Sequence, residues 1–362
     1  KAFILESPYI KRNLFVYEAY NNGKYTIAEK QQMFPHLLNA LSVVIPVLSS
    51  TFASVGRFLK YAGNMSLGML IIDESGQAVP QSALGAIYRT RRAVVVGDPL
   101  QVEPVVTIPK VLIDILVDST GVAKAYKMIE NSAQTFADNM NEFNGMIGKR
   151  RVGCPLVVHR RCIEPMFSIS NLISYDNRMF NKTNKKEEHL KPENPFLIKK
   201  SGWINVEGAE NGGKDHFVKN QAERVCQLME DAVHIYSDLF EADDKIFIIT
   251  PFRTVAESMR KFIIDYFSVK GYDKKILSKW TKNCVGTVHT FQGKDANEVL
   301  LVLGCSNKSA GAMNWVVKKA NILNVACTRA KYRVAFIGNI NDWKNRRYFR
   351  EFIPNLIDII NV

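Results

Sequence analysis

The chain has 362 residues, of which 47% are apolar and 23% are charged, and its 48 lysines and arginines exceed its 35 aspartates and glutamates by 13. This composition is typical of a globular protein and excludes a disordered or collagen-like chain. The length predicts about two domains of roughly 150 residues each. The best apolar run, residues 41–48, is too short to cross a membrane and contains Ser42 and Pro46.

Short apolar runs alternate with amphipathic stretches along the chain. Strands are predicted over residues 67–72, 92–96, 245–249, 299–303 and 333–337, and helices over residues 220–235 and 255–267, with helical cover over 111–147. This alternation predicts an α/β fold whose parallel sheets are flanked by helices on both faces. In such sheets, ligands bind at the carboxyl ends of the strands, where polar residues follow in this chain.

A domain boundary is predicted near residues 148–153, which gives a first domain over residues 1–149 and a second over residues 150–362. Within the second domain, the lysine-rich segment 181–194 and the glycine-containing segment 207–214 are predicted to be exposed loops.

The cysteines, histidines and charge indicate the setting of the protein. The six cysteines form no C-x-x-C pair, which is typical of reduced thiols in the cytosol. The six histidines lack the spacing of a metal-binding motif, so the sequence predicts no zinc site. Residues 1–9 lack the regions of a signal peptide, and a cytoplasmic protein is expected. The positive charge favours nucleic acid as a partner.

Two adjacent carboxylates, Asp73 and Glu74, follow the first predicted strand in the run I-I-D-E-S-G-Q. Such a pair is what nucleotide hydrolysis requires, because one carboxylate holds a magnesium-bound water and the other polarises the attacking water. A strand end followed by an acidic helix cap gives the same pattern, so both interpretations stay open on this pair alone.

A second strand exit carries the run G-D-P-L-Q-V-E-P from Gly97 to Pro104. Its prolines make a rigid loop that presents Asp98 and Gln101, and Gln101 could donate a hydrogen bond to a γ-phosphate. A plain turn with proline stops is the alternative for this segment in isolation.

In combination, these runs resemble motifs II and III of superfamily 1 helicases. Four more segments agree in order: S-S-T-F-A-S from Ser49 resembles motif Ic, T-P-F-R from Thr250 resembles the segment that opens the nucleic-acid face of the second domain, T-V-H-T-F-Q-G-K-D from Thr287 resembles motif V, and N-V-A-C-T-R-A-K from Asn324 resembles motif VI. The match extends over residues 43–338 and is closest to superfamily 1B, the group of the nonsense-mediated-decay helicase. The resemblance implies two RecA-like domains that use ATP and Mg²⁺ in an interdomain cleft to move along single-stranded DNA or RNA.

The resemblance also implies roles for individual residues. Asp73 would hold the metal, Glu74 would be the base, and Arg329 would be an arginine finger. Arg161, or Arg160 one residue earlier, would reach the γ-phosphate. The nucleotide site would further include Gln77, Gly97, Asp98, Gln101, Gln292, Gly293 and Asp295, with Gly293 allowing close backbone approach. The nucleic acid would contact Ser50, Thr51, Pro251, Phe252, Thr287, His289 and Thr290. A satisfied buried histidine is the equal alternative for His289.

The sequence departs from the family pattern in three places. The phosphate-binding run G-x-x-x-x-G-K-[S/T] is absent, which predicts a C-terminal fragment that lacks this loop and that binds and hydrolyses ATP poorly by itself. Val255 stands where the family keeps a glutamine, and Ser75 and Gly76 stand where alanines are frequent, which we interpret as a conservative difference.

The sequence does not give the oligomeric state, and a monomer is expected. Two other functions stay open at this point. One is a non-catalytic nucleic-acid clamp, and the other is the motor module of a nuclease or defence protein. The retained carboxylate pair, Gln101 and Arg329 argue against the clamp.

Overall fold

The computed structural model describes residues 7–23, 25–123, 127, 131–148, 150–183, 196–212, 215–291 and 293–360. The chain divides into two compact units, one formed by residues 1–99 and 103–142 and the other by residues 100–102 and 143–362. The main division falls a few residues before the predicted boundary. No helix in the described ranges has both the length and the apolar character needed to span a membrane.

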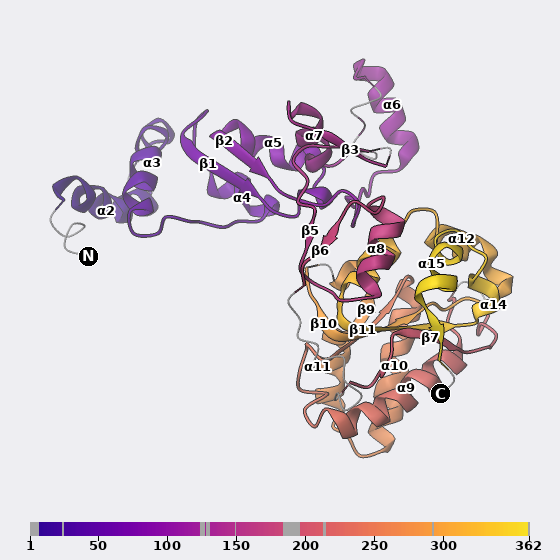
Figure 1. The fold of residues 1–362 in the computed structure, drawn as a ribbon. Coiled ribbons are helices and arrows are strands. Elements are labelled where there is room, and N and C mark those ends of the chain that lie inside the picture. Colours follow the sequence, from indigo (N-terminus) through magenta and orange to yellow (C-terminus); the bar gives the residue numbers. More distant parts are fainter. Residues whose placement is uncertain are drawn as a thin grey trace. The chain divides into compact units, whose positions relative to one another are not determined.

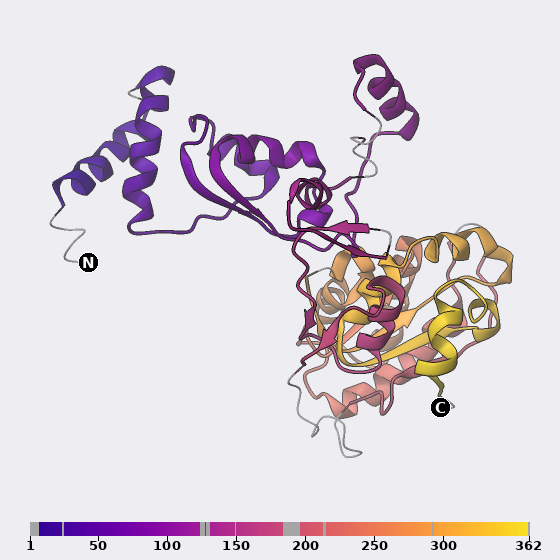
Figure 2. The ribbon, with the colours of Figure 1, turned by 45° about the horizontal axis from the view of Figure 1, so that its top comes forward.

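The first unit combines several helices with one small sheet (Figure 1). Its elements are α2 (Pro8–Asn21), α3 (Ile27–Ser42), α4 (Phe52–Phe58), β1 (Leu67–Ile72), the 3-10 helix η1 (Ser75–Gln77), α5 (Pro80–Tyr88), β2 (Thr90–Val95), α6 (Lys110–Thr120) and α7 (Ala133–Met140). The strands β1 and β2 pair in parallel and lie side by side (Figure 2). Residues 111–147, which were predicted to be helical, are only partly so: they contain α6 and α7, and they end in a strand over Gly145–Ile147.

The two faces of the β1–β2 sheet differ in burial. Leu70 and Ile72 on β1 pack with Val95 against a small core that includes Ala83. Successive side chains of a strand point to opposite faces, and the alternate residue Ile71 is 66% exposed. The prediction of a sheet covered on both faces therefore does not hold for the described residues of this unit.

The second unit is built around a larger sheet. Its strands are β3 (Gly145–Ile147), β4 (Arg150–Val152), β5 (Val158–His159), β6 (Phe180–Asn181), β7 (Gly202–Asn205), β8 (Ile246–Thr250), β9 (Val285–Thr287), β10 (Ala296–Val302), β11 (Ala330–Gly338) and β12 (Asp358–Ile359). Six of them form one parallel sheet in the order β12-β7-β11-β10-β8-β9. The predicted α/β class with parallel sheets is confirmed.

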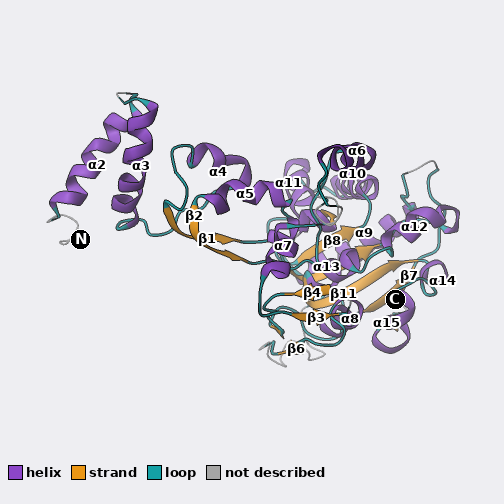
Figure 3. Ribbon diagram, turned by 90° about the horizontal axis from the view of Figure 1, so that it is seen from above, coloured by secondary structure: helices purple, strands orange, loops and turns teal. Residues whose placement is uncertain are grey.

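Helices cover both faces of this six-stranded sheet. The helices of the unit are α8 (Met166–Ser174), α9 (Lys219–Ile235), α10 (Arg253–Val269), α11 (Lys274–Cys284), η4 (Val288–Phe291), η5 (Asn307–Ser309), α12 (Ala310–Val316), α13 (Asn321–Thr328), α14 (Ile340–Trp343) and α15 (Phe349–Leu356). Helices α9, α10 and α11 lie on one side, and α8 and α15 lie on the other (Figure 1, Figure 3). Because both faces are covered, β8 is buried along its whole length, as its unbroken apolar run predicts.

Candidate functional site

The predicted carboxylate pair lies at the carboxyl end of β1 in the first unit. Asp73 and Glu74 are both exposed, and the Glu74 N–H donates a 2.9 Å hydrogen bond to Oδ1 of Asp73. Glu74 has a φ of 51°, in the left-handed region that L-residues rarely adopt. Gln77 donates to Oε2 of Glu74 at 3.2 Å. The structure thus brings three of the predicted nucleotide-site residues together.

The loops that carry motifs II and III are packed backbone to backbone. An ideal Cβ on Gly76 would lie 2.7 Å from the carbonyl oxygen of Asp98, and one on Gly97 would lie 2.6 Å from the backbone nitrogen of Gly76. The Ser75 N–H donates to the carbonyl oxygen of Val96 at 2.9 Å. The glycine at position 76 is therefore required by close approach, and treating it as a conservative replacement of alanine was wrong.

Gln101 belongs to the second unit together with its neighbours Leu100 and Val102. The Asn321 side-chain amide donates to the carbonyl oxygen of Gln101, and the Asn324 amide donates to that of Leu100 at 3.0 Å. The end of the motif III segment is thereby fixed to helix α13, which carries motif VI.

The Asn324 side chain is buried and makes hydrogen bonds to three other residues, a role that was not predicted from the sequence. It is fully buried, its Oδ1 accepts a 2.6 Å hydrogen bond from the Ser170 hydroxyl, and its Nδ2 donates to the Tyr175 hydroxyl at 3.1 Å. Its position as the first residue of N-V-A-C-T-R was the available signal. This one side chain connects α13 to α8 and to Leu100.

Arg329 follows helix α13 and is 0% exposed. Its guanidinium donates to the carbonyl oxygens of Lys294 at 3.0 Å, of Phe291 at 3.4 Å and of Val325 at 3.2 Å. These carbonyl groups hold the guanidinium in one position within the second unit. The predicted role of this residue as an arginine finger stays a prediction.

Further predicted site residues gather around the start of β11. Asp295 forms a 2.8 Å ion pair with Lys331, and the Ile163 N–H, two residues after the half-buried Arg161, donates to the Lys331 carbonyl oxygen at 3.2 Å. Arg160 is exposed. Motifs V and VI and the arginine segment thus meet within one unit.

Of the two neighbouring motif V residues predicted for the nucleotide site, the structure describes Gly293. Gly293 has a φ of 78°, and no heavy atom lies within 4 Å of an ideal Cβ. Its positive φ favours glycine at this position, and the expected close approach of the backbone to a bound nucleotide stays a prediction. Gln292 lies outside the described residues.

The predicted nucleic-acid residues of motifs Ic and V have accessible side chains. Ser50 and Thr51 are exposed just before α4. Thr287 is partly exposed, and His289 and Thr290 are exposed on η4. The exposure of His289 argues against a fully buried histidine, although part of its ring is shielded from water. Desolvation of its ring lowers its pKa.

Pro251 and Phe252 are buried at the carboxyl end of β8. The Phe252 ring packs 4.8 Å from the His216 ring and 5.9 Å from the Trp315 ring, measured between centroids. Trp315 is 51% exposed. The accessible aromatic surface here is therefore that of Trp315, while Val255, also buried, belongs to the core.

Comparison with known families gives the affiliation of the chain. A model described as an AAA domain matches residues 143–341, which is more than half of the chain. The chain belongs to this AAA-domain family. A second AAA-domain model matches residues 12–108.

Several curated relatives of this AAA-domain protein are named as helicases. The chain is 24% identical to the probable helicase senataxin of Mus musculus over 329 residues, covering 88% of this chain and 11% of that protein. It is 27% identical to the regulator of nonsense transcripts 1 of Caenorhabditis elegans over 322 residues, covering 81% of this chain and 26% of that protein. The predicted relationship to the superfamily 1B helicases is confirmed, and the chain spans only a minor part of these relatives.

A solved helicase structure also aligns with the chain. The arterivirus nonstructural protein 10 helicase, solved in complex with DNA, aligns with a TM-score of 0.35 and 12% identity, covering 76% of this chain and 41% of that chain.

Proposed function

We propose that the chain forms part of the core of an ATP-dependent superfamily 1 helicase or translocase that moves along single-stranded DNA or RNA. The observation that carries this proposal is the arrangement at the end of β1. Two exposed carboxylates, Asp73 and Glu74, stand on a loop that is fixed by the close packing of Gly76 against the Asp98 carbonyl group.

The donor set at β1 suits a magnesium-bound nucleotide. Magnesium prefers oxygen ligands and is usually held by one or two carboxylates together with water and phosphate oxygens. Asp73 is the residue that would hold the metal. Bound Mg²⁺–ATP would supply the phosphoryl group that is transferred to water.

Glu74 is the residue that would accept the proton of the attacking water. Its left-handed backbone places it directly beside Asp73, whose Oδ1 accepts the Glu74 N–H at 2.9 Å. Gln77, through its 3.2 Å hydrogen bond to Oε2, orients the carboxylate. Two neighbouring carboxylates thereby take two different roles.

The second unit would supply positive charge to the reaction. Arg329 is the proposed arginine finger, and Arg161 is the proposed γ-phosphate contact. The carbonyl groups of Phe291 and Lys294 fix the guanidinium of Arg329, and a preorganised cation stabilises developing charge without reorganisation during the reaction. Gln101, Gln292, Gly293 and Asp295 would complete this part of the nucleotide site.

The nucleic-acid contacts would come from exposed hydroxyl and imidazole groups. Ser50 and Thr51 belong to the first unit, and Thr287, His289 and Thr290 belong to the second. The net charge of +13 favours phosphate contact, so we expect the affinity to fall steeply with salt concentration.

The deciding experiment is an ATPase assay on the full-length gene product. We expect turnover that depends on Mg²⁺ and is stimulated by single-stranded nucleic acid, with DNA and RNA compared at equal length and composition. Nucleic-acid binding without ATP turnover would support the clamp and contradict the motor.

A further inference from the structure

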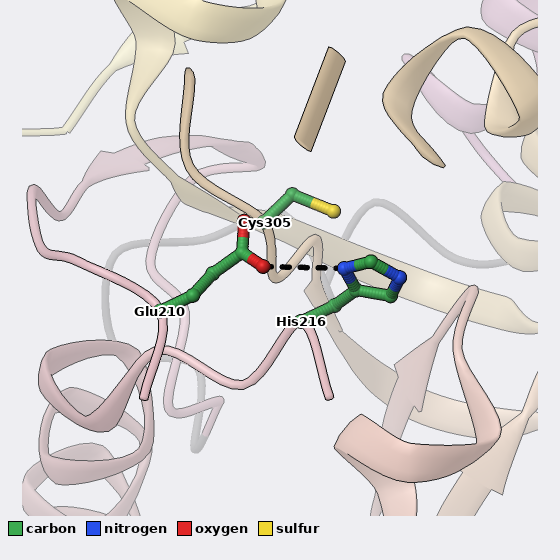
Figure 4. A group of neighbouring side chains, drawn as sticks. All are labelled: Glu210, His216 and Cys305. Atoms are coloured by element: carbon green, nitrogen blue, oxygen red, sulfur yellow. Dashed lines mark hydrogen bonds and ion pairs between the residues drawn. The ribbon is translucent and has the colours of Figure 1, made fainter. Parts of the chain in front are cut away.

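Three side chains from two separate segments of the second unit lie close together. Glu210 and His216 lie in the segment between β7 and α9, and Cys305 lies in the loop after β10. One ligand atom of each lies within 4.8 Å of the others (Figure 4). Carboxylate, imidazole and thiolate are the three ligand types that zinc takes in proteins.

The spacing of the cluster is compatible with one small ion. Nδ1 of His216 lies 3.2 Å from Oε2 of Glu210. Two ligands bonded to the same tetrahedral zinc at about 2.0–2.1 Å lie about 3.3 Å apart. The Glu210–His216 pair therefore has the separation of two ligands of one ion, and the Cys305 side chain lies next to both (Figure 4).

The backbone around the cluster is held in an unusual conformation. His216 and Cys305 have φ values of 57° and 59°, in the left-handed region, and Gly304 has a φ of 60°. The Cys305 N–H donates to the His216 carbonyl oxygen at 2.9 Å, which ties the two segments together. Left-handed L-residues cost free energy and persist where the surroundings fix them, often at ligand sites.

The Glu210 carboxylate is held by an outer set of donors. Its Oε1 accepts from the Ser306 N–H at 2.6 Å and from the Ser306 hydroxyl at 3.2 Å, and its Oε2 accepts from the Ser309 hydroxyl at 2.8 Å. Burial raises the pKa of Glu210, but these hydrogen bonds and the one from His216 outweigh it, so the net pKa is lowered. Ligating carboxylates are commonly oriented by such outer hydrogen bonds.

Hydrogen bonds explain the positions of the Glu210 and His216 side chains, but they do not explain the position of the Cys305 thiol. It is 2% exposed, and within the described ranges its sulfur makes no hydrogen bond. We propose that Glu210, His216 and Cys305 bind one zinc-class divalent cation, with the fourth position open to water. The ion joins the loop after β10 to the segment before α9.

Binding has a defined proton balance. Zinc-class ions bind cysteine as the thiolate, so coordination of Cys305 releases the proton of the thiol to the buffer.

The test uses Co²⁺, whose thiolate complexes absorb light, added to the reduced, chelator-treated full chain. We expect one equivalent to bind with a thiolate-to-cobalt charge-transfer band, and Zn²⁺ to displace it. Calorimetry of Zn²⁺ binding in two buffers of different ionisation enthalpy should show that binding releases protons. Absence of the band from the wild-type protein at equimolar Co²⁺ overturns the proposal without any variant.

Matched variants locate the site. Cys305→Ala should abolish the band, and His216→Ala and Glu210→Gln should each weaken binding by at least tenfold. Cys226→Ala should leave the band unchanged, because Cys226 is not part of the cluster. It is a matched control, since it is also a fully buried thiol whose burial raises its pKa to about 12. A band that survives in Cys305→Ala, or disappears in Cys226→Ala, overturns the assignment.

Discussion

The side-chain amide of Asn324 donates a 3.0 Å hydrogen bond to the main-chain carbonyl of Leu100, a contact across more than two hundred residues of sequence. The same side chain accepts from Ser170 and donates to Tyr175. Because Leu100 directly follows G-D-P, the first residue of motif VI fixes the position of the end of motif III within the second unit.

Replacement of Asn324 should be costly for stability. Asn324→Ala leaves the carbonyl group of Leu100 and the hydroxyl of Ser170 without this partner, and a buried polar group that loses its partner costs about 1–3 kcal/mol. Denaturant unfolding of the full chain measures the loss. Asn341→Ala is the control, because Asn341 is exposed and its Oδ1 accepts from a lysine. Equal stability of the two variants would show that the hydrogen bonds of Asn324 do not stabilise the fold.

The glycine contact between motifs II and III makes a second prediction. Gly76→Ala would place a methyl group 2.7 Å from the Asp98 carbonyl oxygen, so the two loops must separate, and both stability and Mg²⁺–ATP binding should fall. Gly68→Ala on β1 should be tolerated, because no heavy atom lies within 4 Å of an ideal Cβ there. Thermal unfolding and nucleotide binding, compared between these variants, check this; a Gly76→Ala protein with unchanged behaviour disproves the constraint.

The base assignment predicts a separation of binding from turnover. In the full-length protein, Glu74→Gln should abolish ATP hydrolysis while leaving ATP binding intact, because the amide keeps the shape of the side chain but cannot accept the proton. Glu257→Gln, which alters an exposed carboxylate paired with Arg253, should hydrolyse ATP normally. Turnover retained by Glu74→Gln would remove the assignment.

Arg329 should differ in its effect on catalysis from Arg333, a buried arginine on β11. Arg329→Ala is expected to lower kcat by on the order of 10³ in the full-length protein if the residue is the finger. Arg333→Ala removes an arginine that is also buried and also donates to backbone carbonyl groups. Both variants should lose stability, and only Arg329→Ala should lose the catalytic step. An equal effect on kcat would assign Arg329 to structure alone.

His289 predicts a pH dependence of nucleic-acid binding. Desolvation lowers its pKa below the usual imidazole range, so the ring is neutral at pH 7 and gains its charge only at more acidic pH. Affinity for a labelled single-stranded oligonucleotide should therefore rise as the pH falls below the usual imidazole pKa. This increment should be absent from His289→Gln and present in His36→Gln, an exposed histidine of the first unit. Fluorescence anisotropy at constant ionic strength measures it; identical pH profiles for all three proteins would refute the contact.

The sequence predicted the elements with unbroken apolar runs most accurately. The run at residues 67–72 has the bounds of β1, and the five predicted strands all exist. Long apolar runs identify buried strands because few other segments can place every side chain in a core. The exposure of Ile71 was not predictable in this way, because a run does not show how many strands lie beside it.

The sequence identified candidate site residues where they are neighbours in the chain, as Asp73 and Glu74 are, and their catalytic roles stay predictions. Contacts that join distant segments were not predicted. The Asn324–Leu100 hydrogen bond and the Glu210–His216–Cys305 cluster depend on which loops the sheet order brings together. Histidine spacing gave no sign of the cluster, because its side chains come from two separate segments of the chain. The expectation that the chain has no zinc site is untested. Arg329 is a further example of a contact that the sequence does not predict. The identity of a motif residue does not show that its guanidinium donates to backbone carbonyl groups.

The unequal burial of the four tryptophans gives the protein an intrinsic optical reporter. Trp203, Trp280 and Trp343 are almost completely buried, whereas Trp315 is 51% exposed. A water-soluble quencher should therefore reach the indole of Trp315 and leave the blue-shifted emission of the other three. Because the Trp315 ring packs against the Phe252 ring, which in turn packs against the His216 ring, its emission can follow ligand binding at this end of the sheet without an added dye.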